Sequence, residues 1–91
     1  RQEKIIWRSD RTAEVNAQID IGELNELMDI SLPDENDFES LGGFLASQMG
    51  KIPQIHESIQ YDNVTFKVLR GTKRKLLWIE VTKEGEGEEE K

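Results

Sequence analysis

Three acidic side chains stand close together at residues 34–37, and they are of the type that binds hard metal ions. Asp34, Glu35 and Asp37 fall within this short stretch, and Mg²⁺ and Ca²⁺ prefer carboxylate oxygens as ligands. The stretch does not have the glycine and the final glutamate of an EF-hand loop at the required offsets. Acidic residues also suit the start of a helix, where the dipole favours negative charge. The sequence therefore offers these three residues as a candidate Mg²⁺ or Ca²⁺ site, with helix capping as the alternative.

The other reactive side chains do not form a catalytic pattern. His56 is the single histidine and cysteine is absent, so disulfides and thiolate metal sites are excluded. A nucleophile needs a neighbouring base, and His56 is the only candidate for that role. The pair Gly42-Gly43 lacks the spacing of a phosphate-binding loop and the Lys-Ser or Lys-Thr that follows one, which favours close packing. We expect no catalytic residues, and we expect His56 to lie in a surface loop.

Basic residues gather at residues 70–75, between two stretches that alternate like strands. Their position predicts a hairpin turn, whose charges either keep a sheet edge soluble or contact acidic lipid head groups or a partner domain. Trp7 and Trp78 belong either to the core or to an exposed docking surface, and two tryptophans in so small a domain favour the core. The candidate partner surface consists of four residues: Arg70, Lys73, Arg74 and Trp78.

The composition indicates one small domain that does not bind nucleic acid. The chain has 91 residues, of which 35% are hydrophobic and 34% are charged, and this length suits a single domain. A net charge of −7 opposes binding to nucleic-acid phosphates, which requires a basic surface. The sequence has no run of about 20 apolar residues, the length that spans a bilayer. Residues 84–91 contain five glutamates, and we expect a disordered acidic tail there. Since the first residue is Arg1, we expect the chain to be one domain of a longer protein.

Hydrophobic spacing predicts two strands and a helix in the first third of the chain. Residues 5–7 form an apolar cluster within an N-terminal segment, 1–11, and residues 12–19 alternate apolar and polar side chains like a half-buried strand. A helix is predicted to follow Asp20, which can cap its first turn with Glu23 in capping-box position. The helix is expected to end near Asp29. Its buried side contains Ile21, Leu24, Leu27 and Met28, and its solvent side contains Asn25 and Glu26.

A second helix and three strands complete the predicted fold. The helix is expected to begin after a cap at Asp37 and to end at Gly50, with Gly42-Gly43 inside it and Phe44 to one side of the buried stripe Phe38, Leu41, Leu45 and Met49. Strands are predicted at 59–61, 64–69 and 77–82, with turns at 62–63 and 71–73. The order β-β-α-α-β-β-β gives an α+β fold, in which two short helices cover one face of a small antiparallel sheet. We place this domain at residues 12–83.

Several short motifs in a fixed order resemble the CorC/HlyC transporter-associated domain over residues 12–82. The motifs are Glu23-Leu24-Asn25-Glu26-Leu27, Leu32-Pro33-Asp34, Leu41-Gly42-Gly43, Gly50-Lys51-Ile52-Pro53, and Tyr61-Asp62-Asn63 followed by the strand at 64–69. The resemblance implies a fold similar to the FAD-binding and transporter-associated domain-like fold. It also implies a C-terminal position in a membrane protein with a CBS pair, similar to magnesium and cobalt efflux proteins and to haemolysin-like proteins.

From this resemblance we expect a non-catalytic regulatory or interaction domain on the cytoplasmic side of the bacterial inner membrane. Its expected partners are the CBS pair and the membrane domain of the same polypeptide, or a second copy of itself, and nucleic acid is not among them. No cofactor is expected. The alternative, which the fold resemblance alone implies, is a module that binds FAD or an adenine nucleotide. A third hypothesis is an enzyme, such as an acyltransferase, in which His56 would be the base.

Overall fold

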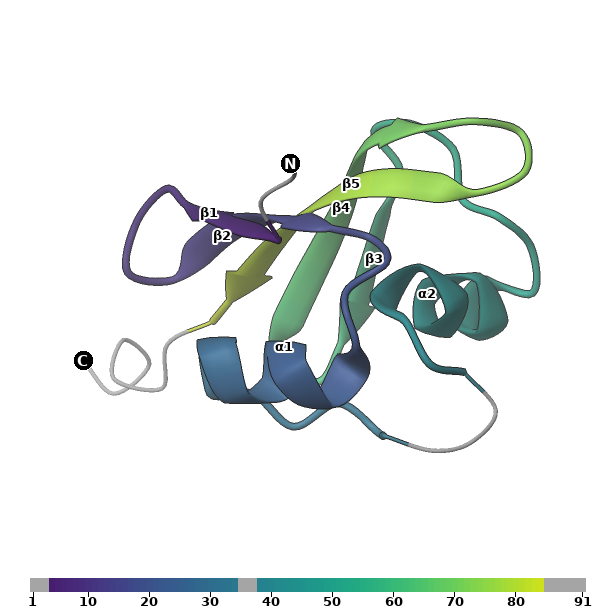
Figure 1. The fold of residues 1–91 in the computed structure, drawn as a ribbon. Helices are drawn as coiled ribbons and strands as arrows, with labels where there is room; N and C mark the ends of the chain where they lie inside the picture. The colour runs from purple at the N-terminus through teal and green to yellow at the C-terminus, as the bar shows by residue number, and fades with distance from the viewer. Residues whose placement is uncertain (1–3, 35–37, 85–91) are drawn as a thin grey trace.

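The computed structural model describes residues 4–34 and 38–84, which form one antiparallel sheet and two helices. The strands have the spatial order β1-β2-β5-β4-β3, and both helices lie on the same side of the sheet (Figure 1). The predicted α+β fold and its element order are therefore confirmed. The strands are β1 (Ile5–Trp7), β2 (Thr12–Asn16), β3 (Ser58–Tyr61), β4 (Val64–Gly71) and β5 (Leu76–Lys83), and the helices are α1 (Ile21–Met28) and α2 (Leu41–Met49). The tail predicted at 84–91 lies, apart from Glu84, outside the described residues.

The core lies between the helices and one face of the sheet. Alternate residues of the three inner strands point into it and are buried: Ala13, Val15, Val64, Phe66, Val68, Ile79 and Val81. Phe44 of α2 lies at the centre of an aromatic cluster, with ring centroids 5.2 Å from Phe38, 5.3 Å from Tyr61 and 6.3 Å from Phe66. All three pairs have the edge-to-face geometry that aromatic rings prefer. This cluster joins α2 to β3 and β4.

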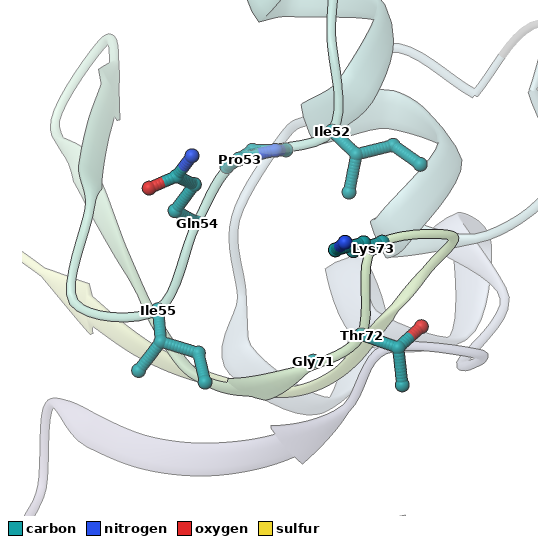
Figure 2. A pocket seen from close by; sticks show the side chains of 7 residues that line it. All are labelled: Ile52, Pro53, Gln54, Ile55, Gly71, Thr72 and Lys73. Carbon is teal, nitrogen blue, oxygen red and sulfur yellow. The ribbon is translucent and has the colours of Figure 1, made fainter.

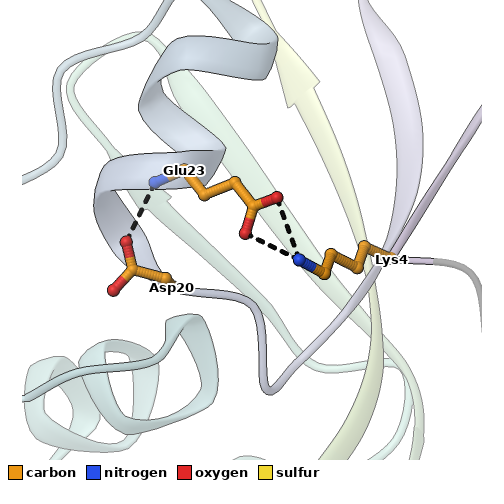
Figure 3. Close-up of polar contacts among 3 residues, drawn as sticks. All are labelled: Lys4, Asp20 and Glu23. Carbon is orange, nitrogen blue, oxygen red and sulfur yellow. Dashed lines mark hydrogen bonds and ion pairs between the residues drawn. The ribbon is translucent and has the colours of Figure 1, made fainter.

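The first helix begins and ends where the sequence predicts. Asp20 caps it, because the Asp20 carboxylate accepts a hydrogen bond from the Glu23 N–H at 3.0 Å. The Glu23 carboxylate in turn accepts from Lys4 Nζ at 3.1 and 3.2 Å, which ties the start of β1 to the first turn of α1 (Figure 3). Asp29 ends the helix in the left-handed conformation, with φ of 57°.

The solvent-facing prediction for Asn25 is wrong. Its side chain is partly buried and makes two hydrogen bonds to the backbone of Leu32. Asn25 Nδ2 donates to the Leu32 carbonyl at 3.0 Å, and Asn25 Oδ1 accepts from the Leu32 N–H at 2.8 Å. A carboxamide carries a donor and an acceptor side by side, so one residue of α1 holds the connector that follows it. Leu27, which was predicted to be buried, is 43% exposed.

The second helix begins three residues later than the predicted start at Phe38. Ser40 is its N-cap, and Ser40 Oγ accepts from the Gly43 N–H at 3.2 Å. The next amides bond to the segment before α1, with the Leu41 N–H donating to the Ile19 carbonyl and the Gly42 N–H to the Ala17 carbonyl. Phe44 is fully buried and does not lie to one side. Gly50 ends the helix with φ of 75°, as predicted.

The close packing predicted for Gly42-Gly43 is confirmed at Gly42 and not at Gly43. A Cβ at Gly42 would lie 3.3 Å from the Ala17 carbonyl oxygen and 3.4 Å from the Ala17 Cβ. A Cβ at Gly43 would meet only ordinary contacts at 3.5 Å. The backbone of α2 therefore approaches its neighbour closely at one glycine of the pair and not at the other.

Paired irregularities near the β4–β5 hairpin alter the predicted alternation of β5. Val68 pairs with Ile79 and Arg70 with Trp78, so Leu69 is an extra residue on β4. Leu77 is likewise extra on β5, because Gly71 pairs with Leu76. Leu76 is consequently the buried residue in place of the predicted Leu77. The core prediction for the tryptophans is also wrong: Trp7 is 44% exposed, and Trp78 is partly buried on the sheet face opposite the helices.

Candidate interaction surface

A tight turn holds the basic residues of the β4–β5 hairpin. The Thr72 N–H donates to the Lys75 carbonyl at 2.8 Å, and Thr72 Oγ1 accepts from the N–H groups of Arg74 and Lys75, each at 3.1 Å. A threonine hydroxyl that bonds nearby amides in this way stabilises a turn. Lys73, Arg74 and Lys75 are all exposed, and none of them makes an ion pair with a described residue. The predicted hairpin position of this cluster is confirmed.

A surface cavity of about 590 Å³ lies between this hairpin and the loop that follows α2 (Figure 2). Its walls are Ile52, Pro53, Gln54 and Ile55 from the loop and Gly71, Thr72 and Lys73 from the hairpin. The Ile55 side chain is 49% exposed. The loop is anchored next to β4, since the His56 N–H donates to the Val68 carbonyl at 2.7 Å and the Val68 N–H donates to the Glu57 carbonyl at 3.0 Å. The cavity therefore combines apolar walls with one basic side chain.

The four residues proposed as a partner surface fall into two neighbouring parts. Lys73 and Arg74 are on the tip of the hairpin, whereas Arg70 and Trp78 are paired across β4 and β5 at its base, on the face opposite the helices. Directly opposed residues of an antiparallel pair share a face. Arg8 and Glu14 lie elsewhere on that face and form a bidentate pair at 3.0 and 3.1 Å. The hydrogen bond and the charge of Glu14 raise the pKa of the Arg8 guanidinium above its ordinary value.

Of the candidate metal ligands, the structure describes only Asp34, and Glu35 and Asp37 lie outside the described residues. Asp34 is exposed and reaches the first turn of α1. A Cβ at Gly22 would lie 2.8 Å from Asp34 Oδ2 and 3.2 Å from Asp20 Oδ2. The described part of the chain contains no group of three or more acidic, histidine or cysteine side chains suited to a metal. The helix dipole accounts for two carboxylates at this position.

The described residues do not fit the pyrophosphate of FAD at a helix N-terminus, where amides must be free to bind an anion. In α2, the amides of Leu41, Gly42 and Gly43 already donate to Ile19, Ala17 and Ser40. In α1, the first turn lies under the carboxylates of Asp20 and Asp34. Both helix starts thus lack the free amides or the positive potential that a pyrophosphate needs.

His56 lies in an exposed loop, as predicted, and its backbone has a positive φ of 75°. Its side chain makes no hydrogen bond with a described residue, so no side chain of the described ranges orients it as a base. Neither helix of the described ranges has the length and apolarity needed to cross a bilayer.

The sequence matches the family model for the transporter associated domain, CorC_HlyC, over residues 7–85. This match covers most of the 91 residues. The chain belongs to this family. The resemblance drawn from the motifs is therefore confirmed, and the family is described by association with transporters and not by an enzymatic activity.

Two relatives of known name are exporters, and the chain spans only a small part of each. It is 32% identical over 71 residues to the magnesium and cobalt efflux protein CorC of Buchnera aphidicola. This aligned region is 78% of this chain and 24% of that protein. It is 28% identical over 69 residues to the polyamine export protein of Haemophilus influenzae. This aligned region is 75% of this chain and 16% of that protein. Most of each exporter thus lies outside the region of similarity.

Solved structures of CorC_HlyC domains have the same fold. The domain from Nitrosomonas europaea superposes with a TM-score of 0.83 at 26% identity and covers 91% of this chain and 99% of its own. A domain from a Xylella fastidiosa haemolysin, described as a complex with Mg²⁺ and Mn²⁺, gives a TM-score of 0.78 at 18% identity, with coverage of 91% and 100%. The fold class predicted from the sequence is confirmed by these similarities.

Proposed function

We propose that this chain is a non-catalytic regulatory or interaction module of a CorC-type membrane protein. In this proposal the module lies on the cytoplasmic side of the bacterial inner membrane and contacts the CBS pair and the membrane domain of its own polypeptide. The observation that carries this proposal is the family match over residues 7–85. In the two named exporters, the region similar to this chain makes up only 24% and 16% of the protein's length. Such a small share suits a part that modulates transport.

The proposed cargo of the parent protein is a cation, either a metal ion or a larger organic cation. The two named relatives export magnesium and cobalt in one case and polyamines in the other. These cargoes share positive charge. The described residues of this domain offer them no assembled metal-binding group. We therefore propose a Mg²⁺ or Co²⁺ exporter as the first parent to test and place its conduction path in other parts of the polypeptide.

The test is an efflux measurement on a parent protein that carries this chain. Deleting residues 12–82 is expected to change Mg²⁺ or Co²⁺ efflux or the assembly of the protein. Unchanged efflux together with unchanged assembly would remove the proposal. Gly43→Ala is the control: a methyl group there meets only ordinary contacts, so the variant should fold at least as well as the wild type and leave efflux unchanged. Analytical ultracentrifugation of the chain by itself tests the other expected partner, a second copy.

A second candidate function is cation sensing at residues 34–37. It is favoured by the proximity of Asp34 to Asp20 over the first turn of α1 and by the Mg²⁺ and Mn²⁺ complex of the similar Xylella domain. An amide NMR titration with Mg²⁺ should then give saturating shifts at residues 20–23 and 34 that disappear in Asp34→Asn. A titration without localised shifts in the wild-type chain would exclude this function.

A further inference from the structure

Charge is separated along the two central strands of the sheet. At one end, Asp29 and Asp62 line one surface hollow and the Glu84 N–H donates to the Asn63 carbonyl at 2.7 Å, while Lys83, the last residue of β5, is a cation at the same end. At the other end are Arg70, Lys73, Arg74 and Lys75. The strands β4 and β5 have eight residues each. At about 3.4 Å per residue, the acidic and the basic ends lie roughly 25 Å apart.

The basic cluster lies mostly in the turn and not on a strand edge. Charged residues commonly keep an exposed edge strand from pairing with another chain. The hairpin joins β4 and β5, which lie inside the order β1-β2-β5-β4-β3, but β3 pairs with β4 only from Val64 to Lys67. Edge protection therefore suits Arg70, in the stretch of β4 that β3 does not reach, whereas the other three cations lie beyond the strands, at residues 73–75.

The cluster also contributes little to the fold. Lys73, Arg74 and Lys75 are exposed and make no ion pair with a described residue. The turn is held by hydrogen bonds of Thr72 and of the backbone, which do not require basic side chains at these three positions. Unpaired surface charges of one sign repel each other, so a gathering of them is most useful where an opposite charge approaches from outside.

An exposed apolar side chain lines the same cavity as one of these cations. Ile55, at 49% exposure, lines the same cavity as Lys73 (Figure 2). Basic residues next to an exposed aliphatic side chain are the combination that binds the interface of an anionic membrane, where cations meet head groups and apolar groups enter the acyl boundary.

We propose that the β4–β5 hairpin end of this domain docks on the surface of an anionic lipid bilayer, with Lys73, Arg74 and Lys75 against the head groups and Ile55 at the acyl boundary. Part of the acidic charge behind the net charge of −7 lies at the far end of the sheet in this orientation. The acidic end would stand roughly 25 Å from the lipid, and the Debye length is only about 8 Å at physiological salt. The hairpin is a turn at the end of the sheet (Figure 1), so a plane of head groups can meet its neighbouring cations together. This docking goes beyond the proposed function and does not depend on the cargo of the parent protein.

Vesicle co-sedimentation of the whole 91-residue chain tests the docking. The chain should sediment with phosphatidylcholine–phosphatidylglycerol vesicles and not with phosphatidylcholine vesicles, and high salt should release it. The variant K73Q/R74Q/K75Q should weaken the apparent association constant about tenfold or more. The matched control S31D/Q60E/N63D lowers the net charge by the same amount at the acidic end and should bind within about twofold of the wild type, because screening hides distant charge.

Three results would overturn the docking. The first is failure of the wild-type chain to bind anionic vesicles at physiological salt, where the distant acidic charge is screened. The second is an equal loss of binding in the two variants, which would make net charge alone the cause. The third is binding to soluble polyglutamate as tight as to the vesicles, which would assign the surface to an acidic protein partner. Circular dichroism of both variants verifies that they are folded. A changed efflux in the deletion experiment would leave the proposed function intact even if the vesicles fail to bind.

Discussion

The two ends of the β4–β5 pair are built differently, although they belong to the same two strands. At the end near α1, Lys83 Nζ donates to the Met28 carbonyl at 2.7 Å, the Glu84 N–H donates to the Asn63 carbonyl, and the Lys83 N–H donates to the Arg11 carbonyl at 2.9 Å. At the hairpin end, extra residues interrupt the ladder and the basic side chains have no ion-pair partner among the described residues. One end connects the sheet to the rest of the domain, and the other presents charge to the outside.

This difference separates residues that stabilise the domain from residues that are available for recognition. Changes in the core and at the end near α1 should lower the free energy of unfolding. Changes at the hairpin should leave that free energy almost unaltered and act on binding.

The largest effect on stability is expected from Phe44→Ala. Phe44 is fully buried and contacts Phe38, Tyr61 and Phe66 edge to face, so truncation removes the centre of the aromatic cluster and leaves a cavity. The free energy of unfolding should fall by about 3–5 kcal/mol, measured by urea denaturation followed by circular dichroism. Phe44→Leu keeps most of the volume and should cost less than half as much. Equal losses in both variants would contradict this account, because they would show that the lost volume is not what destabilises the domain.

The two neighbouring glycines should respond in opposite directions to the same substitution. Alanine favours a helix by about 1 kcal/mol over glycine. Gly43→Ala should therefore stabilise the domain, because the new Cβ meets only ordinary contacts. Gly42→Ala brings a Cβ to 3.3 Å from the Ala17 carbonyl oxygen that accepts the Gly42 N–H and should be less stable than Gly43→Ala by about 1–2 kcal/mol. Equal melting temperatures would refute the close approach at Gly42.

Lys83→Met tests the end near α1 with a smaller expected effect. The substitution keeps the apolar stem of the side chain but removes the charged donor to the Met28 carbonyl, in the last turn of α1. A loss of about 1 kcal/mol is expected, from one hydrogen bond and a favourable interaction with the helix dipole. Lys73→Met makes the same chemical change at the hairpin end. If Lys73→Met destabilised the domain as much as Lys83→Met, the contrast between the two ends would be lost.

The smallest effect on stability is expected for the hairpin variant K73Q/R74Q/K75Q. All three side chains are exposed and lack ion pairs with described residues, so the free energy of unfolding should change by less than about 0.5 kcal/mol. Thermal unfolding of the variant and the wild type at the same pH and salt measures this difference. A decrease of several kcal/mol would mean that the cations support the fold.

Local pattern predicts most of this fold, because each element has its own signal in the sequence. The cap at Asp20, the left-handed end at Gly50 and the turn at Asp62-Asn63 depend on side chains next to the backbone that they serve, and the structure has all three. The alternation of Val64, Phe66 and Val68 likewise places these residues in the core.

Long-range contacts explain where the sequence predictions were wrong. The start of α2 depends on hydrogen bonds to Ile19 and Ala17, which are distant in sequence and give no local sign. The Asn25 side chain is partly buried because it bonds to the backbone of Leu32. Leu76 is buried in place of Leu77 because extra residues on both β4 and β5 shift the alternation. The exposure of Trp7 follows from its place on the edge strand β1, where the helices do not cover it.

The candidate surface was partly accessible from the sequence. The basic cluster and its hairpin follow from residues 70–75 alone. The position of Ile55 does not follow from these residues, because the loop after α2 is held beside β4 by hydrogen bonds of His56 and Glu57 with Val68. The inner position of β4 and β5 is a property of the whole sheet.

The most direct test of the difference between the two ends is an amide NMR spectrum of the chain with anionic bicelles. The account predicts that line broadening is confined to residues 51–55 and 70–75, and that the amides of Asp29, Asp62 and Glu84 keep their free-state shifts. Broadening centred on residues 29, 62 and 84, or a spectrum that does not change at all, would contradict it.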